Sequence, residues 1–173
     1  MADLLTHVLV AYVLATVLSW RYDWITPPLV TVAMVGAAVP DLTRVELLVP
    51  AGTIEAVLGV PFSWSPIHRV GGTALVVLLA GPLVSAEHRR RVLVLLELGA
   101  ISHYALDAMI YTGSGLTWPM LWPLTDYRFE VSGFYRSSDR WPALVSGLVA
   151  LVVWMASRRR STSERDPPVP ERR

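Results

Sequence analysis

Five apolar stretches alternate with shorter polar connections along the chain, and the pattern predicts that each stretch is a helix. They run from about Leu4 to Trp20, Pro28 to Pro40, Val70 to Ala86, Val92 to Tyr111, and Trp141 to Ser157. A bilayer core of about 30 Å needs roughly 20 apolar residues, and about 17 suffice for a short or untilted span. The pattern therefore predicts an all-α fold, a polytopic membrane bundle of about five transmembrane helices.

The first two stretches need separate interpretation. The first lacks the basic start of a secretion signal and carries His7 in its first turns, so we expect it to be retained. The second begins at Thr26-Pro27-Pro28, which is typical of a helix cap followed by proline in the first turn, but its apolar run is short. We expect it either to span with the help of Trp24 and Ile25 or to be partly re-entrant.

The connections and the tail complete the predicted organisation. Residues 42–66 favour an amphipathic interfacial helix, or two, broken near Pro50 and Gly52. Residues 112–140 are rich in aromatic side chains, which prefer the headgroup region, so this loop is expected to lie over the membrane surface. We predict one membrane-embedded domain at 1–157 and a disordered cytoplasmic tail at 158–173.

Composition supports the membrane class and limits the available chemistry. Of 173 residues, 53% are hydrophobic and 17% are charged, whereas soluble domains are about a quarter charged. A formal net charge of +1 gives no reason to expect a nucleic-acid partner. Because the chain has no cysteine, any metal must be bound by histidine and carboxylate, a ligand set that suits zinc, manganese or iron.

The arginine runs predict how the chain lies in a cell membrane. Arg89–Arg91 and Arg158–Arg160 directly follow the third and fifth apolar stretches. Because cytoplasmic connections are enriched in basic residues, both ends are predicted to face the cytoplasm. The chain is therefore predicted to be a multi-pass protein with its N-terminus outside and its C-terminus in the cytoplasm.

On this map five possible metal ligands lie near the outer ends of the apolar stretches: His7, Asp41, His68, His103 and Asp107. The spacing of His103 and Asp107 places both side chains on one helical face. Ionisable groups are costly in hydrocarbon, so several at a similar depth indicate a functional site. The sequence therefore predicts a divalent metal site near the outer membrane face.

Several of these residues also have plainer interpretations. The His103 and Asp107 pair could simply satisfy its own hydrogen bonds. Asp3, four residues before His7, could hold that imidazole in one tautomer or merely cap the first helix. Arg69 could bind a phosphate oxygen or extend to lipid headgroups. The hydroxyl of Tyr104 could reach the site or serve packing alone.

Several short motifs follow one another along the chain: Thr6-His7, Pro40-Asp41, His68-Arg69, Gly72-Thr73, Ser102-His103 with Leu106-Asp107, Thr112-Gly113, and Leu121-Trp122-Pro123-Leu124. In this order they resemble the YdjM-like family of membrane-bound, metal-dependent hydrolases. The resemblance implies that the five residues named above are metal ligands. The order of ligands is also similar, more distantly, to that of zinc-dependent phospholipases C. The chain departs from the family pattern at Thr43 and Ala74, where an acidic residue and a histidine are common.

The resulting functional prediction is a metal-dependent hydrolase in the lipid bilayer that acts on a lipid headgroup or phosphodiester at the outer face. Asp41 is the predicted catalytic carboxylate, because it lies near water and beside the ion. One alternative is a non-catalytic membrane protein with a degenerate metal site, as the departures at Thr43 and Ala74 would allow. Another is a small transporter or channel that uses the same cluster as an ion path.

Overall fold

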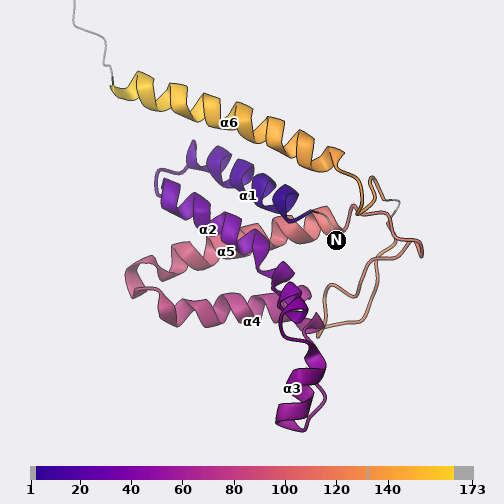
Figure 1. Ribbon diagram of the computed structural model, residues 1–173. Helices are drawn as coiled ribbons and strands as arrows, with labels where there is room; N and C mark the ends of the chain where they lie inside the picture. Colours follow the sequence, from indigo (N-terminus) through magenta and orange to yellow (C-terminus); the bar gives the residue numbers. More distant parts are fainter. Residues whose placement is uncertain (1–2, 132, 166–173) are drawn as a thin grey trace, which may run out of the picture.

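Five helices aligned along one direction form the body of the molecule (Figure 1). They are α1 (Leu4–Ser19), α2 (Pro27–Ala38), α4 (Val70–Ala80), α5 (Ala86–Asp107) and α6 (Trp141–Arg165). The computed structural model describes residues 3–131 and 133–165. Within these residues the fold is all-α, as predicted, and the only β-structure is two isolated bridges in the loop after α5.

Each predicted apolar stretch is helical, but some boundaries differ. The third ends early, because α4 stops at Ala80 and a 3-10 turn, Gly81–Leu83, contains a proline that cannot continue the helix. The fourth starts early, at Ala86, and ends at Asp107. The arginine run at 89–91 thus lies within α5, where hydrophobic patterning alone gave no reason to place it.

The first part of the tail, which was predicted to be disordered, is helical. Helix α6 continues without interruption from Trp141 to Arg165, so residues 158–165 are helical. The apolar run ends near Ser157, but a helix needs no apolar residues to continue once it has been nucleated. Residues 166–173 lie outside the described part of the chain.

Small residues allow α2 and α5 to pack with their backbones close together. A Cβ atom added to Gly99 would collide with the backbone of Ala33 and Ala37, and one added to Gly36 would collide with that of Leu96. Both alanines are fully buried. Close approach over small side chains is the usual way for helices to associate in lipid. It also fixes how α2 and α5 are positioned relative to each other along the bundle axis, and therefore where Ala37 lies relative to His103.

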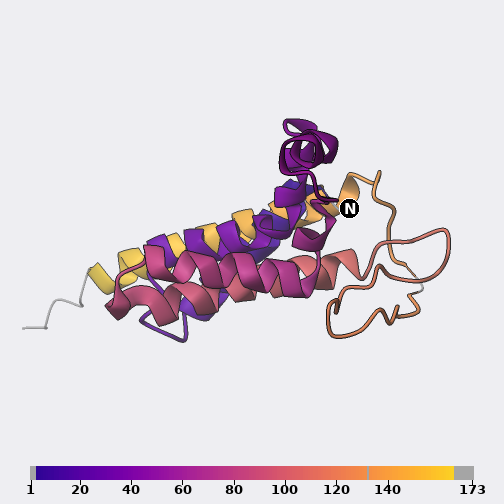
Figure 2. The same cartoon turned by 90° about the horizontal axis from the view of Figure 1, so that it is seen from below.

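The connection between α2 and α4 contains two short helical segments and a third turn. They are η1 (Pro40–Leu47), α3 (Ala51–Leu58) and η2 (Ser65–His68), which agrees with the predicted break near Pro50. Helix α3 projects from the bundle (Figure 2) and has no buried residue. It ends at Gly59, whose φ of 67° is the left-handed conformation that glycine adopts readily.

The loop between α5 and α6 has little regular structure and lies across the end of the bundle from which α3 projects (Figure 2). It is anchored on the start of α4, where the Val70 amide donates to the Met120 carbonyl at 2.9 Å and the Gly71 amide donates to the Trp122 carbonyl at 3.1 Å. It is also anchored near α5, where the Tyr111 amide donates to the Tyr135 carbonyl at 2.7 Å. These bonds place the loop's aromatic residues over the helix ends.

Among the described residues, α6 is the single helix that is long and apolar enough to cross a bilayer alone, over Trp141–Arg160. Pro27–Ala38 and Pro40–Leu47 together pass the same test but are bent by 59°, and Leu4–Ser19 and Val70–Leu83 are shorter apolar helices. At 1.5 Å per residue, the 16 residues of α1 extend about 24 Å, less than a typical hydrocarbon core. Five complete spans therefore stay a prediction.

Candidate metal centre

The main helices begin or end at the end of the bundle covered by the loop (Figure 1), and all of them except α6 carry or adjoin a candidate ligand there. Helix α1 begins there with His7, α2 ends there just before Asp41, η2 places His68 before α4, and α5 ends there with His103 and Asp107. The alternating direction of successive helices is what brings residues separated by a hundred positions to the same end.

Asp107 is the centre of the cluster, because three imidazoles contact its carboxylate. His68 Nε2 lies 3.0 Å from Asp107 Oδ2, His103 Nε2 lies 3.4 Å from the same oxygen, and His7 Nε2 lies 3.5 Å from Oδ1. The side chains of His7 and His103 are fully buried. The predicted pairing of His103 with Asp107 on one helical face is confirmed, and two further histidines share the carboxylate.

Backbone carbonyls fix the orientation of two imidazoles. Nδ1 of His103 donates to the Ala37 carbonyl at 2.8 Å, and Nδ1 of His68 donates to the Pro40 carbonyl at 3.1 Å. A carbonyl oxygen can only accept, so each Nδ1 carries a proton and each neutral ring directs the lone pair of Nε2 toward Asp107. Metal-binding histidines are typically held by such a bond on the second nitrogen.

This arrangement places hydrogen-bond acceptors against one another. In the neutral rings of His68 and His103, Nε2 is an acceptor, and both face carboxylate oxygens of Asp107 at 3.4 Å or less. A cation between them, either a proton or a metal ion, would remove the repulsion. His7 stacks on His103 with ring centroids 3.7 Å apart, so protonating every ring would place like charges in contact. One divalent ion would satisfy the three rings together.

Among the described residues, the imidazole of His7 has no polar partner outside this cluster. Its Nδ1 is buried and has no hydrogen-bond partner among the described residues. The suggested tautomer-fixing bond from Asp3 is not formed, because Asp3 is exposed and its carboxylate makes no cap hydrogen bond. The backbone carbonyl of Asp3 instead accepts from the Thr6 amide at 2.9 Å, in the first turn of α1.

Asp41 is buried and is positioned by an arginine that sequence reasoning did not single out. Arg44 Nη2 lies 3.1 Å from Asp41 Oδ2, at an i,i+3 spacing within η1. That spacing was the available signal, since residues three apart share a helical face. The side chain of Asp41 is 2% exposed, so the expectation that it lies near water is wrong, and Arg44 orients a buried carboxylate. The role of Asp41 as the catalytic carboxylate stays a prediction.

All five predicted ligands belong to two overlapping groups. Ligand atoms of His7, His103 and Asp107 lie within 4.8 Å of one another, and so do those of Asp41, His68 and His103. His103 belongs to both groups. The structure therefore brings together every residue proposed from the sequence as a metal ligand, with spacings that a bound ion could use.

A hydroxyl pair next to the cluster holds the η2 turn against α5. Thr73 Oγ1 donates to the Ile67 carbonyl at 2.6 Å, so the Tyr104 hydroxyl, 2.5 Å from the same oxygen, donates to Thr73. Thr73 is 1% exposed. Tyr104 thus reaches the edge of the site rather than its centre, and it supports the turn that carries His68.

The loop leaves a small cavity beside Asp107. Its volume is about 170 Å³, and its walls include Thr112, Thr117 and Trp118. Trp122 of the same loop stacks under Arg69, whose guanidinium carbon lies 5.2 Å from the ring centroid. This stacking holds the Arg69 side chain against the loop.

The electrostatics of the accessible edge favour a charged histidine when no metal is bound. Burial is the largest single influence on the pKa of His68 and lowers it, but the hydrogen bonds to Asp107 and Pro40 and the negative charges of Asp107 and Asp41 together raise that pKa more, so the net shift is upward from 6.5. The site thus attracts positive charge. A proton at His68 would occupy the position that a metal ion would otherwise use.

A helical bundle with exposed apolar faces and a buried histidine and carboxylate cluster at one end defines a helical membrane protein with a candidate metal centre. The chain belongs to the YdjM inner membrane protein family, whose model matches residues 1–164. That match confirms the resemblance inferred from the motifs. No curated protein and no solved structure matches the chain.

Proposed function

We propose that the chain is a membrane-bound, metal-dependent hydrolase whose centre is formed by His7, Asp41, His68, His103 and Asp107. The observation that carries the proposal is the inward direction of the imidazoles. Two of them are held by backbone carbonyls so that their lone pairs converge on one carboxylate. With neutral rings this places acceptors against an acceptor, so the cluster needs a cation between them, and a metal ion meets that need for all three rings at once.

The donor set fits zinc, manganese or iron, all of which bind imidazole and carboxylate. When bound, such an ion lowers the pKa of a coordinated water toward about 7 and polarises a phosphoryl or carbonyl oxygen. The chain's own contribution is orientation. His68 and His103 are fixed through their second nitrogens, and Asp41, held by Arg44, is the proposed acceptor of the water's proton.

The proposed substrate is a lipid headgroup or a phosphodiester at the outer membrane face. The cavity beside Asp107 opens among loop residues that include Trp118, which is 72% exposed and suited to the interfacial region. Large apolar side chains cover the outside of the helices, among them Leu79 and Leu144 at 64% and 68% exposure. We further propose that the helices lie in the bilayer as five spans or near-spans, with the cluster on the outer side.

Metal content is the first test. Detergent-purified protein, stripped by chelation and reloaded with zinc, manganese or iron, should retain a stoichiometric amount after removal of free ion. His103→Ala and Asp107→Ala should lose it. His88→Ala is the matched control, since His88 is exposed, bonds Ser85, and belongs to neither ligand group. If the control and His103→Ala retain equal metal, the centre does not exist.

Hydrolysis is tested next, on the metal-loaded protein reconstituted in phospholipid vesicles. Release of a water-soluble headgroup product should require metal and should fall by a hundredfold or more in Asp107→Ala. A protein that binds metal stoichiometrically but releases no product from any phospholipid or soluble phosphodiester would retain the metal centre and refute the hydrolase assignment.

A further inference from the structure

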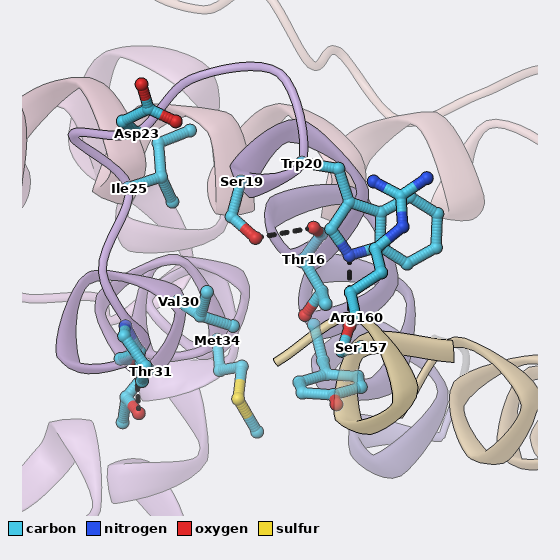
Figure 3. A pocket seen from close by; sticks show the side chains of 12 residues that line it. Thr16, Ser19, Trp20, Asp23, Ile25, Val30, Thr31, Met34, Ser157 and Arg160 are labelled. Carbon is cyan, nitrogen blue, oxygen red and sulfur yellow. Dashed lines mark hydrogen bonds between the residues drawn. The ribbon is translucent and has the colours of Figure 1, made fainter. Parts of the chain in front are cut away.

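A second polar pocket lies at the other end of the bundle from the metal centre. It has a volume of about 590 Å³ and is lined by residues of α1, α2, α6 and the turn between α1 and α2. Figure 3 shows Trp20, Asp23, Thr31, Ser157 and Arg160 around it. None of its lining residues belongs to the metal cluster. Because this end carries the arginine runs, it is the predicted cytoplasmic side.

The pocket lies between α2 and α6, both of which pack on α1 within the described residues. Contacts of α6 with α1 are extensive, whereas α2 packs against α1 and α5. Tyr12 and Thr16 of α1 form the floor between α2 and α6, and Met34 lines the wall on α2. In a bilayer such a gap between helices must be occupied, and the available molecules at this depth are lipids.

One wall offers a preorganised cation. Trp20 Nε1 donates to Ser157 Oγ at 3.0 Å, which fixes the indole, and the guanidinium carbon of Arg160 lies 4.5 Å from the centroid of that ring. Figure 3 shows Arg160 beside Trp20 at the pocket. No carboxylate forms an ion pair with Arg160 among the residues whose side chains are described. A guanidinium held in this way suits a phosphate group.

The other wall offers the opposite charge, and the floor has an unused hydrogen-bonding group. Asp23 lines the pocket from the turn between α1 and α2, and Figure 3 places it across the pocket from Arg160. Thr16 is 6% exposed, and its hydroxyl has no hydrogen-bond partner among the described residues. A buried hydroxyl without a partner is costly, which indicates that a ligand supplies one.

We propose that this pocket binds a glycerophospholipid whose headgroup carries a primary ammonium, with the phosphate at Arg160 and the ammonium at Asp23. Opposite charges on opposite walls match a zwitterion better than they match a free anion. The apolar lining, including Val30 and Met34, continues toward the bilayer core, where the acyl chains would lie. The site is independent of the proposed hydrolase centre and needs no metal.

Binding can be measured by native mass spectrometry of the full chain, released from detergent in the presence of defined lipids. Phosphatidylethanolamine should bind about tenfold more tightly than phosphatidylcholine, whose quaternary ammonium cannot donate a hydrogen bond to a carboxylate. Arg160→Gln should weaken both lipids about tenfold. Asp23→Asn should weaken phosphatidylethanolamine alone and remove the difference between the two.

Two controls carry the same charge changes outside the pocket. Arg159→Gln alters the neighbouring exposed arginine, and Asp126→Asn alters an exposed carboxylate in the loop after α5. Both should bind lipid as the unaltered chain does. Equal binding by Arg160→Gln and Arg159→Gln would overturn the phosphate assignment, and equal affinity for the two lipids in the unaltered chain would overturn the ammonium assignment.

Two further outcomes would reject a lipid as the occupant. If inorganic phosphate at millimolar concentration displaces the bound lipid from the unaltered chain, the pocket is a free phosphate site. If removing lipid leaves a dimer that Arg160→Gln dissociates, the gap between α2 and α6 is filled by a second copy of the chain.

Discussion

Replacing Gly99 with alanine tests whether close helix packing positions the metal centre. The new Cβ would collide with backbone atoms of Ala33 and Ala37, which cannot move aside as a flexible side chain would. Helices α2 and α5 must therefore separate. The Ala37 carbonyl would move away from Nδ1 of His103, to which it is bonded at 2.8 Å.

The expected change in the free energy of unfolding of Gly99→Ala is the difference between two opposing contributions. Overpacking in a tight core costs about 1–3 kcal/mol, and a clash with backbone belongs at the upper end of that range. Replacing glycine within a helix recovers about 1 kcal/mol. The expected result is a net destabilisation of about 2 kcal/mol. Because the bond that orients His103 is also lost, metal affinity should fall about 10-fold to 100-fold.

Thermal unfolding in detergent and metal titration measure the two effects. Gly147→Ala is the matched control, since its new Cβ would have only a side-chain atom of Leu9 nearby, at 3.9 Å. That variant should be as stable as the unaltered chain, or more so, with unchanged metal affinity. If Gly99→Ala and Gly147→Ala behave alike in both assays, the α2 and α5 contact does not set the geometry of the site.

Two further predictions concern His68. Thr73→Val keeps the side-chain shape but removes the hydroxyl that joins the Ile67 carbonyl to Tyr104. It should therefore lower the free energy of unfolding by about 1–3 kcal/mol and weaken metal binding. The control Thr31→Val, on the exposed face of α2, should change neither. The raised pKa of His68 means that its protonated form stabilises the metal-free fold below pH 6.5, and that this stabilisation is lost as the pH rises through the higher folded value. Metal affinity should rise over the same interval, by at most about tenfold per pH unit for one released proton. Metal titrations at several pH values check this. If the slope of the logarithm of metal affinity against pH is the same in His68→Gln as in the unaltered chain, the prediction is contradicted.

The helices and the convergence of the site were predictable from sequence because both follow from simple alternation. Successive apolar stretches reverse direction, so ligands at the start of one stretch and the end of the next lie at the same end of the bundle. His7 and Asp107 are a hundred positions apart, yet their side chains are 3.5 Å apart. The order of the motifs indicated the family, and the family model confirms it.

Details that depend on backbone geometry were not predictable. Nothing in the residue types indicates that the carbonyls of Ala37 and Pro40 orient two imidazoles, since every residue has a carbonyl. Arg69 stacks on Trp122 only because the loop after α5 bonds to the start of α4. The number of spans was not settled by the pattern, because hydrophobicity alone does not fix where a helix ends, although Pro82 was a readable signal that α4 stops early.

The number of metal ions is constrained by His103, which belongs to both ligand groups. Its Nδ1 donates to the Ala37 carbonyl, so only Nε2 is available to an ion, and one nitrogen binds one ion at a time. Both groups can therefore be complete only if a single ion uses them together. Thr43 and Ala74 point the same way, since neither position offers a carboxylate or an imidazole to a second ion.

We therefore expect one ion per chain at saturation, measured as the ratio of metal to protein after removal of free ion. Asp41→Asn should weaken binding without changing that ratio, because Asp41 would be one ligand of a single centre. A ratio of two in the unaltered chain, falling to one in Asp41→Asn, would show instead that His7 with Asp107 and His68 with Asp41 hold separate ions. The bond from His103 to Ala37 would then have to break when the second ion binds.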